Sequence, residues 1–331
     1  MVVALVDRVL ALLDQNPDMS AVILSGVDWA NAFARGDPTT TIAKFIKLGL
    51  RPSLVPLLID YFSERKMTVH FNTARSSVIR LIGGFPEGSL IGQDAYIVAS
   101  NDSASMTKPE DRFKYIDDLE IAELIGLAGI LVDYDVLSHV PSDISVGQKF
   151  LPPQATMSQE YLDSIQNWTS DNLMKINTSK TNYMVFSRCQ QDFATRLSIN
   201  GDVIDRKKVV KILGVWISED AGDWSINTSE ICKKSYGRIS MLSKLKYAGL
   251  SVEDLLEIYC LFVRSKAEYC SVAFASSLTQ EQVRKIENIE KTCLRIILQE
   301  MYIGHEEACE MLGIFSVTKR RDNCLLSYAQ K

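Results

Sequence analysis

The feature that most constrains this chain is a pair of adjacent carboxylates, Asp117 and Asp118, set between two apolar segments. Phe113, Tyr115 and Ile116 lead into the pair, and a second apolar run follows it. This pattern predicts two strands joined by a tight acidic turn. Adjacent acids between buried strands are costly without a counter-charge, and a divalent cation is the simplest one. The alternative is a solvated acidic turn that binds no metal.

A third acid has a similar setting. Residues 20–27 (SAVILSGV) form a short apolar run that predicts a buried strand, and Asp28 stands at its end. Mg²⁺ prefers a few carboxylate oxygens together with phosphates and waters. Two such ions can activate an attacking hydroxyl and stabilise the leaving oxygen of a phosphoryl transfer. Asp28, Asp117 and Asp118 are therefore candidate ligands of two Mg²⁺ ions, with Mn²⁺ as the alternative ion.

The remaining chain mixes helical and strand patterns before it becomes helical. Helical periodicity is expected at residues 1–15, 40–47, 53–65, 90–99, 124–139 and 158–174. Strand patterns occupy residues 66–72, 182–188 and 196–218, the last with a hairpin turn at Asn200-Gly201. From Ser229 onward the periodicity is mostly helical. The change from a mixed half to an all-helical half near Asp220 predicts a domain boundary there.

Composition narrows the class of protein. The chain has 331 residues, enough for two compact domains, with 47% hydrophobic and 23% charged residues, as in soluble globular proteins. It has no long uncharged apolar run, so no membrane span is expected. Seven irregularly spaced cysteines favour reduced thiols in an intracellular protein of the cytoplasm or nucleus. Three dispersed histidines do not indicate a zinc site. These are His70, His139 and His305.

Charge is unevenly distributed. The net charge of −5 argues mildly against nucleic-acid binding, yet residues 206–246 hold nine basic and four acidic side chains. Lys233, Lys234 and Arg238 in this stretch lie at helical spacing. A local basic surface is what contact with a phosphate backbone requires, whatever the total charge. The alternative is an ordinary solvated helix face.

Five segments resemble the ordered motifs of reverse transcriptases. Residues 28–33 (DWANAF) resemble motif A, residues 83–89 (GGFPEGS) motif B, and residues 113–119 (FKYIDDL) motif C. Residues 177–181 (NTSKT), followed by residues 184–186, look like motif D, and residues 211–215 (KILGV) look like motif E. Five motifs in the family's order are far more specific than any one of them. The chain thus resembles the reverse transcriptase of a non-LTR (LINE-type) retrotransposon.

The resemblance implies an α+β fold and a polymerase activity. Residues 1–219 would form a polymerase-type palm with an antiparallel sheet and packed helices, and residues 220–331 a helical thumb and C-terminal region. The implied enzyme is an RNA-directed DNA polymerase, a nucleotidyltransferase. Its primer 3′-hydroxyl attacks a deoxynucleoside triphosphate, so its partners are an RNA template, a DNA primer and deoxynucleoside triphosphates. No membrane partner is implied, and protein partners are unknown.

The resemblance also implies the catalytic residues. Asp28 and Asp117 would ligate both metals, with Asp118 assisting. Lys180 would donate a proton to the leaving pyrophosphate or clamp its charge. The alternative for Lys180 is a surface lysine.

The nucleotide site is implied by motifs A and B. Phe33 would pack against the nucleotide sugar and exclude a ribose 2′-hydroxyl, unless it is simply a core aromatic. Pro86, Glu87 and Gly88 would form the loop over the nucleotide, where glycine permits close backbone approach. Ser89 would cap the following helix.

Contacts with the nucleic acid are implied by motif E and the basic stretch. Motif E would form a primer-grip hairpin, and a thumb helix would follow the backbone phosphates without reading sequence. The residues implied for these contacts are Lys211, Leu213, Gly214, Lys233, Lys234 and Arg238. The alternatives are an ordinary hairpin and a solvated helix face.

The chain departs from the family at several places. Ala34 stands where motif A usually has an aspartate after Ala-Phe, and Glu87 where motif B usually has glutamine. A carboxylate beside a triphosphate adds like-charge repulsion. Only one basic residue, Arg8, precedes Asp28, whereas the family has a basic fingers segment there. We therefore expect an N-terminally truncated palm with the fingers largely absent, and a weakly active or inactive chain.

Two other functions stay open. One is a catalytically dead, retroelement-derived domain that at most binds nucleic acid. The other is an unrelated enzyme with a two-metal carboxylate site.

Overall fold

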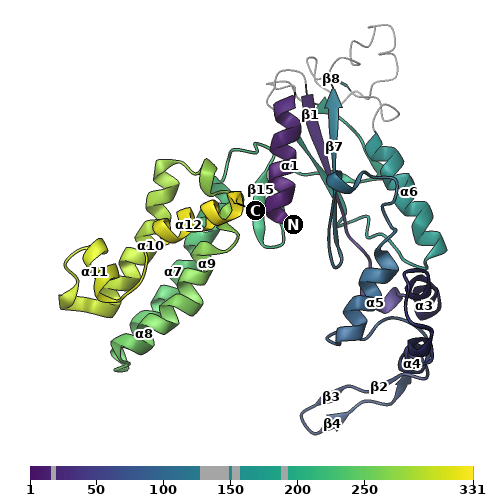
Figure 1. Cartoon of the computed structure of the whole chain (residues 1–331), viewed down its shortest axis with the longest axis horizontal. Helices are drawn as coiled ribbons and strands as arrows, with labels where there is room; N and C mark the ends of the chain where they lie inside the picture. Colours follow the sequence, from purple (N-terminus) through teal and green to yellow (C-terminus); the bar gives the residue numbers. More distant parts are fainter. Residues whose placement is uncertain (16–19, 127–148, 151–156, 188–192, 331) are drawn as a thin grey trace. The chain divides into compact units, whose positions relative to one another are not determined.

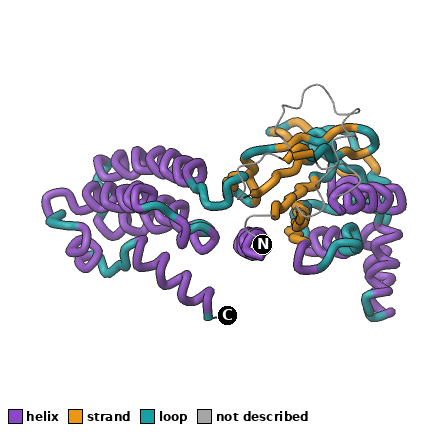
Figure 2. Tube along the Cα trace, turned by 90° about the horizontal axis from the view of Figure 1, so that it is seen from above, coloured by secondary structure: helices purple, strands orange, loops and turns teal. Residues whose placement is uncertain are grey.

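The computed structural model describes residues 1–15, 20–126, 149–150, 157–187 and 193–330 (Figure 1). They form two compact units: Met1 with Leu12–Lys207, and Val2–Ala11 with Lys208–Lys331. Figure 2 shows most strands in the first unit and mostly helices in the second. The predicted boundary between residues 219 and 220 stays a prediction, and the division between Lys207 and Lys208 lies close to it.

A five-stranded sheet forms the centre of the first unit. Its strands are β1 (Ser20–Val27), β6 (Arg112–Tyr115), β7 (Asp118–Gly126), β9 (Asn182–Ser187) and β13 (Asp205–Arg206), in the order β13-β9-β1-β7-β6. The central β1 pairs antiparallel with β7 and β9, whereas β13 pairs parallel with β9. Ala21, Val22 and Ile23 are fully buried, as expected for an apolar strand covered on both faces. The sheet and the helices beside it confirm the mixed α+β class.

The helices confirm most of the expected segments. They are α1 (Val2–Gln15), α2 (Ala32–Arg35), α3 (Pro38–Lys47), α4 (Val55–Phe62), α5 (Leu90–Ser100) and α6 (Met157–Asp171), with 3-10 turns at Pro52–Leu54 and Pro109–Asp111. Helix α3 begins where the Asp37 carboxylate accepts hydrogen bonds from the amides of Thr39 and Thr40. Helices α4, α5 and α6 bury apolar side chains in the core that also holds Ile23 of β1.

The expected helix at residues 124–139 is wrong at its start. Leu124 pairs with Val22 inside the β1–β7 ladder, and β7 continues to Gly126. Apolar residues at the end of a buried strand match a helical period equally well, so periodicity could not separate the two. The other residues of that expected helix lie outside the described ranges.

Short strand pairs complete the first unit. They are β2 (Lys66–Met67) with β5 (Ile79–Arg80), β3 (His70–Phe71) with β4 (Ala74–Arg75), β8 (Lys149–Phe150) with β10 (Phe193–Ala194), and β11 (Ser198–Ile199) with β12 (Asp202–Val203). The strand expected at residues 66–72 is therefore two exposed two-residue pieces. The hairpin turn at Asn200-Gly201 is confirmed, with φ of 55° and 86°.

The second unit joins a hairpin to packed helices. Its elements are β14 (Val209–Ile212), β15 (Val215–Ser218), α7 (Ser225–Tyr247), α8 (Val252–Ile258), the π-helical η6 (Tyr259–Arg264), α9 (Ser265–Glu268), α10 (Gln280–Leu298), α11 (His305–Met311) and α12 (Val317–Ala329). Helix α7 packs on α10, with Leu242 and Leu294 fully buried. The mostly helical C-terminal region is confirmed.

Among the described residues, no helix combines the length and the apolar character needed to span a membrane. The cysteines within these residues are free thiols.

Candidate active site

Strand register brings the three predicted carboxylates together. Val27 pairs with Leu119 between β1 and β7, so Asp28, the next residue along, lies opposite Asp118. Tyr115 pairs with Asp118 between β6 and β7, so the hairpin turn consists of Ile116 and Asp117. The turn is thus one residue earlier than predicted, and Asp118 begins β7.

The three acids are close enough to repel one another. Burial, followed by the charges of Asp117 and Asp28, raises the pKa of the Asp118 carboxyl. The Asp28 Oδ2 atom is buried and has no hydrogen-bond partner. A buried carboxylate oxygen without a partner is costly, and oxygen ligands of this kind suit Mg²⁺. A divalent cation bound beside Asp28 Oδ2 would supply the missing partner.

Residues of predicted motif D are hydrogen-bonded to the backbone of Asp28. The Asp28 amide donates to Thr181 Oγ1 at 3.2 Å, and the Asn177 amide donates to the Asp28 carbonyl at 2.8 Å. Lys180 occupies the turn between these contacts, and its side chain is exposed. The turn therefore holds the Lys180 backbone near Asp28.

Phe33 lies on a tyrosine that the sequence analysis missed. The rings of Phe33 and Tyr96 stack with centroids 4.8 Å apart. Tyr96 is fully buried, and its hydroxyl has no hydrogen-bond partner. Burial raises the pKa of this hydroxyl, and the charges of Asp117, Asp28 and Asp118 raise it further. Tyr96 thus lies close to all three acids, and nothing in its local sequence indicates this.

The glycine-rich loop is hydrogen-bonded to Phe33 of α2 and to Gly36, which follows that helix. The Gly84 amide donates to the Gly36 carbonyl and the Phe85 amide to the Phe33 carbonyl, both at 2.7 Å. Arg65 Nη2 donates to the carbonyls of Gly83 and Gly84 at 2.7 and 2.5 Å. These bonds fix the loop relative to Phe33.

The rest of the loop leads into α5. Ser89 caps the helix as predicted, because its Oγ accepts from the Gly92 amide at 3.0 Å. The same Oγ donates to the Pro86 carbonyl at 3.0 Å. Gly88 has a φ of 75°, which suits glycine, and Glu87 is exposed.

A fourth acid, Glu120, also lies beside the site and was missed. It follows Asp118 by two positions on β7, so both side chains lie on the same face of the sheet. Burial and the charge of Asp118 raise the pKa of Glu120 to about 8. A Cβ on Gly26 would lie 2.9 Å from Glu120 Oε2, so glycine leaves room for this carboxylate.

The predicted primer-grip residues form the β14–β15 hairpin of the second unit. Leu213 and Gly214 make its turn, with φ of 45° and 88°. Tyr269 donates from its hydroxyl to the Leu213 carbonyl at 2.7 Å. Lys211 lies 5.6 Å over the Trp216 ring.

Four cations of the second unit gather near this hairpin, and we call them the basic cluster. They are Lys211, Lys234, Arg238 and Lys266. Burial, followed by the charges of the other three, lowers the pKa of Lys266, which was not predicted. Arg238 also donates to the Phe262 carbonyl. Lys233 is 80% exposed and lies 4.0 Å from Glu230.

Sequence comparison with known proteins finds RNA-directed DNA polymerases, in agreement with the motif resemblance. The RNA-directed DNA polymerase from mobile element jockey of Drosophila funebris is 25% identical over 252 residues, covering 75% of this chain and 25% of that protein. Its Drosophila melanogaster counterpart is 24% identical over 164 residues, covering 50% and 16%. The chain thus spans a quarter or less of the length of these curated relatives. No protein-family profile matches it.

Solved structures with some likeness are telomerases. Apo telomerase from Candida tropicalis aligns with a TM-score of 0.44 and 12% identity, over 92% of this chain and 46% of that one. Telomerase from the same organism with the TWJ fragment of telomeric RNA gives 0.42 and 14%, over 93% and 52%. Both TM-scores are too low to support an inference about function.

The similarity to reverse transcriptases that the motifs predicted is confirmed by the sequence comparison. More particularly, its curated relatives are RNA-directed DNA polymerases of jockey, a LINE-type element.

Proposed function

We propose that the first unit carries the nucleotidyl-transfer site of an RNA-directed DNA polymerase. The observation that supports this most strongly is the β1–β7 register, which sets Asp28 opposite Asp118 and beside the Asp117 turn. The carboxylates of Asp28 and of the adjacent Asp117 and Asp118 would otherwise repel one another without compensation. The activity named for the curated relatives agrees with this arrangement.

Asp28 and Asp117 would hold two Mg²⁺ ions, or Mn²⁺, and Asp118 would assist. The unpartnered Asp28 Oδ2 supports this assignment. Bound in such a pair, the ions supply activation of the primer 3′-hydroxyl and stabilisation of the leaving oxygen.

The chain's own side chains would orient the nucleotide. Phe33, stacked on the buried Tyr96, would pack against the sugar and exclude a 2′-hydroxyl. The loop at Pro86 and Gly88 would cover the nucleotide, held by the Ser89 cap. Lys180 would keep a proton available for the leaving pyrophosphate.

The second unit would bind the RNA template and the DNA primer. The β14–β15 hairpin and the basic cluster offer cations that can contact backbone phosphates without reading sequence. Lys233, which is largely exposed, would add a further contact.

A second candidate is a domain that binds nucleic acid and has little or no polymerase activity. Glu87 favours it, because this exposed carboxylate lies in the loop proposed to cover a triphosphate. Ala34, in place of the aspartate that usually follows Ala-Phe in motif A, favours it too. This candidate predicts salt-dependent duplex binding with little or no nucleotide incorporation.

Primer extension on poly(rA)·oligo(dT) with Mg²⁺ tests the first candidate. We expect weak dTTP incorporation that falls by about 10²-fold or more in the Asp117→Ala, Asp118→Ala double variant. Asp94→Ala, which removes an exposed acid of α5, is the matched control and keeps the wild-type rate. Equal rates in all three proteins would remove the catalytic assignment. Duplex binding without incorporation by the wild type would favour the second candidate.

A further inference from the structure

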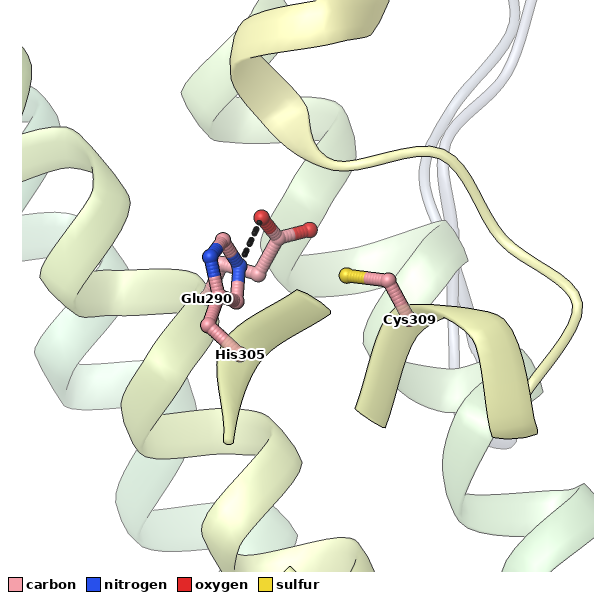
Figure 3. A group of neighbouring side chains, drawn as sticks. All are labelled: Glu290, His305 and Cys309. Atoms are coloured by element: carbon pink, nitrogen blue, oxygen red, sulfur yellow. Dashed lines mark hydrogen bonds and ion pairs between the residues drawn. The ribbon is translucent and has the colours of Figure 1, made fainter. Parts of the chain in front are cut away.

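Three different potential metal ligands meet in the second unit, whereas the acids of the proposed active site belong to the first. Glu290 lies on α10, and His305 and Cys309 lie one turn apart on α11. The ligand atoms of these three residues all lie within 4.8 Å of one another. Figure 3 shows the Glu290 carboxylate between the His305 ring and the Cys309 thiol, with the thiol pointing toward it.

Glu290 is a buried carboxylate with mostly neutral partners. Its side chain is completely buried. It accepts hydrogen bonds from the Tyr259 hydroxyl at 2.8 Å and the Val317 amide at 3.0 Å, both of which are neutral. His305 Nε2 lies 2.8 Å from Glu290 Oε2, and Arg264 lies over the Tyr259 ring. A buried carboxylate needs a counter-charge, so a cation beside Oε2 would stabilise it.

The ligand chemistry narrows the choice of cation. An imidazole nitrogen, a thiolate sulfur and a carboxylate oxygen are the three ligand types that Zn²⁺ accepts, usually in tetrahedral geometry. Hard cations such as Mg²⁺ and Ca²⁺ prefer oxygen ligands alone. The mixed set therefore favours zinc over the ions expected at the Asp triad.

Two residues of the cluster border a cavity, whereas Glu290 is fully buried. His305 and Cys309 line a cavity of about 1010 Å³. Four further carboxylates line it, against two lysines: Glu287, Glu306, Glu307 and Glu310, with Lys291 and Lys319. The acidic lining raises the local concentration of cations. The volume of the cavity leaves room for a water as a fourth ligand.

We propose that Glu290, His305 and Cys309 form a zinc site whose fourth ligand is water. Bond lengths of about 2.0–2.2 Å to nitrogen and oxygen require the His305–Glu290 contact to open by roughly half an ångström. Binding converts the Cys309 thiol to a thiolate and releases its proton to solvent. The two negative ligands then balance the charge of the ion. The bound ion joins α10 to α11.

Cobalt substitution in the full chain, after removal of bound metal by a chelator, tests the site. We expect one equivalent of Co²⁺ to produce a thiolate-to-cobalt charge-transfer band and strong tetrahedral d–d bands, both removed by Zn²⁺. Cys309→Ser should lose the charge-transfer band, and His305→Ala should weaken binding at least tenfold. Cys324→Ser, at an exposed thiol, is the matched control and keeps the band.

Two results of the cobalt experiment would contradict the zinc site. Absence of the charge-transfer band in the wild type, or its persistence in Cys309→Ser, would overturn the site and leave a metal-free His305–Glu290 hydrogen bond. Zn²⁺ should also raise the thermal unfolding midpoint of the wild type but not that of Cys309→Ser. A cooperative unfolding transition in Cys309→Ser shows that this variant is folded. The Asp117→Ala, Asp118→Ala variant should keep the band. The test is thereby independent of the proposed polymerase function.

Discussion

At the residue scale, the acids were predictable and their buried neighbours were not. Asp28, Asp117 and Asp118 could be found because each interrupts or ends an apolar run. Tyr96 could not, because a tyrosine in an amphipathic helix has no local sign of its distance to acids elsewhere in the sequence. Only the strand register, a property of the folded sheet, brings these residues together.

Replacing Tyr96 by phenylalanine tests the buried hydroxyl. Since this hydroxyl has no partner, Tyr96→Phe should stabilise the protein by up to about 1 kcal/mol. The matched control is Tyr259→Phe, which removes a hydroxyl that donates to the buried Glu290. That change should destabilise the protein by about 1–3 kcal/mol. Urea unfolding measures both, and equal losses would show that the Tyr96 hydroxyl is hydrogen-bonded after all.

At the element scale, periodicity located most helices and strands but misjudged boundaries. The acidic turn lies one residue earlier than expected, because Asp118 is already paired with Tyr115. The helix expected from residue 124 begins inside β7. The strand at residues 66–72 is split, because its side chains are exposed and have no core to pack against. In each case tertiary pairing decided what a local pattern left open.

The contact between motif A and the glycine-rich loop can be tested at Gly36. A Cβ on Gly36 would lie 2.0 Å from the Phe85 ring, which packs in turn on Phe62. Gly36→Ala should therefore destabilise the first unit by about 1–3 kcal/mol. Gly83→Ala is the control, since its Cβ would make an ordinary 3.7 Å contact. If chemical denaturation gives the same midpoint for both variants, the loop is not packed as described.

At the scale of the whole molecule, the net charge does not show that basic side chains gather in one part of the chain. A chain of charge −5 still gathers Lys211, Lys234, Arg238 and Lys266 in its second unit. The sequence indicated the basic stretch but missed Lys266, which lies beyond it on α9. The Glu290 cluster was equally unpredictable, because it joins a single histidine to a thiol one turn away and to an acid on another helix. Such groups form through helix packing, which spacing along the chain does not encode.

Salt dependence tests the basic cluster. Changing Lys211, Lys234 and Lys266 together to glutamine should weaken duplex binding and reduce the slope of log K against log salt by roughly 1 per lysine. Lys285→Gln is the control, because Lys285 is paired with Glu281 on α10 at 2.7 Å. Fluorescence anisotropy at several salt concentrations gives both slopes. An unchanged slope in the triple variant would show that these lysines do not contact phosphates.

The proposed function depends on Asp28, Asp117 and Asp118 forming one divalent-cation site. Fe²⁺ bound in place of Mg²⁺, with ascorbate and peroxide, releases hydroxyl radicals that cut the backbone beside the ion. We predict cleavage at two separate places, near residue 28 and near residue 117, that excess Mg²⁺ suppresses and Asp28→Asn abolishes. Asp94→Asn should leave both cuts unchanged. Cleavage at only one of these places, or cleavage that persists in Asp28→Asn, would contradict the claim.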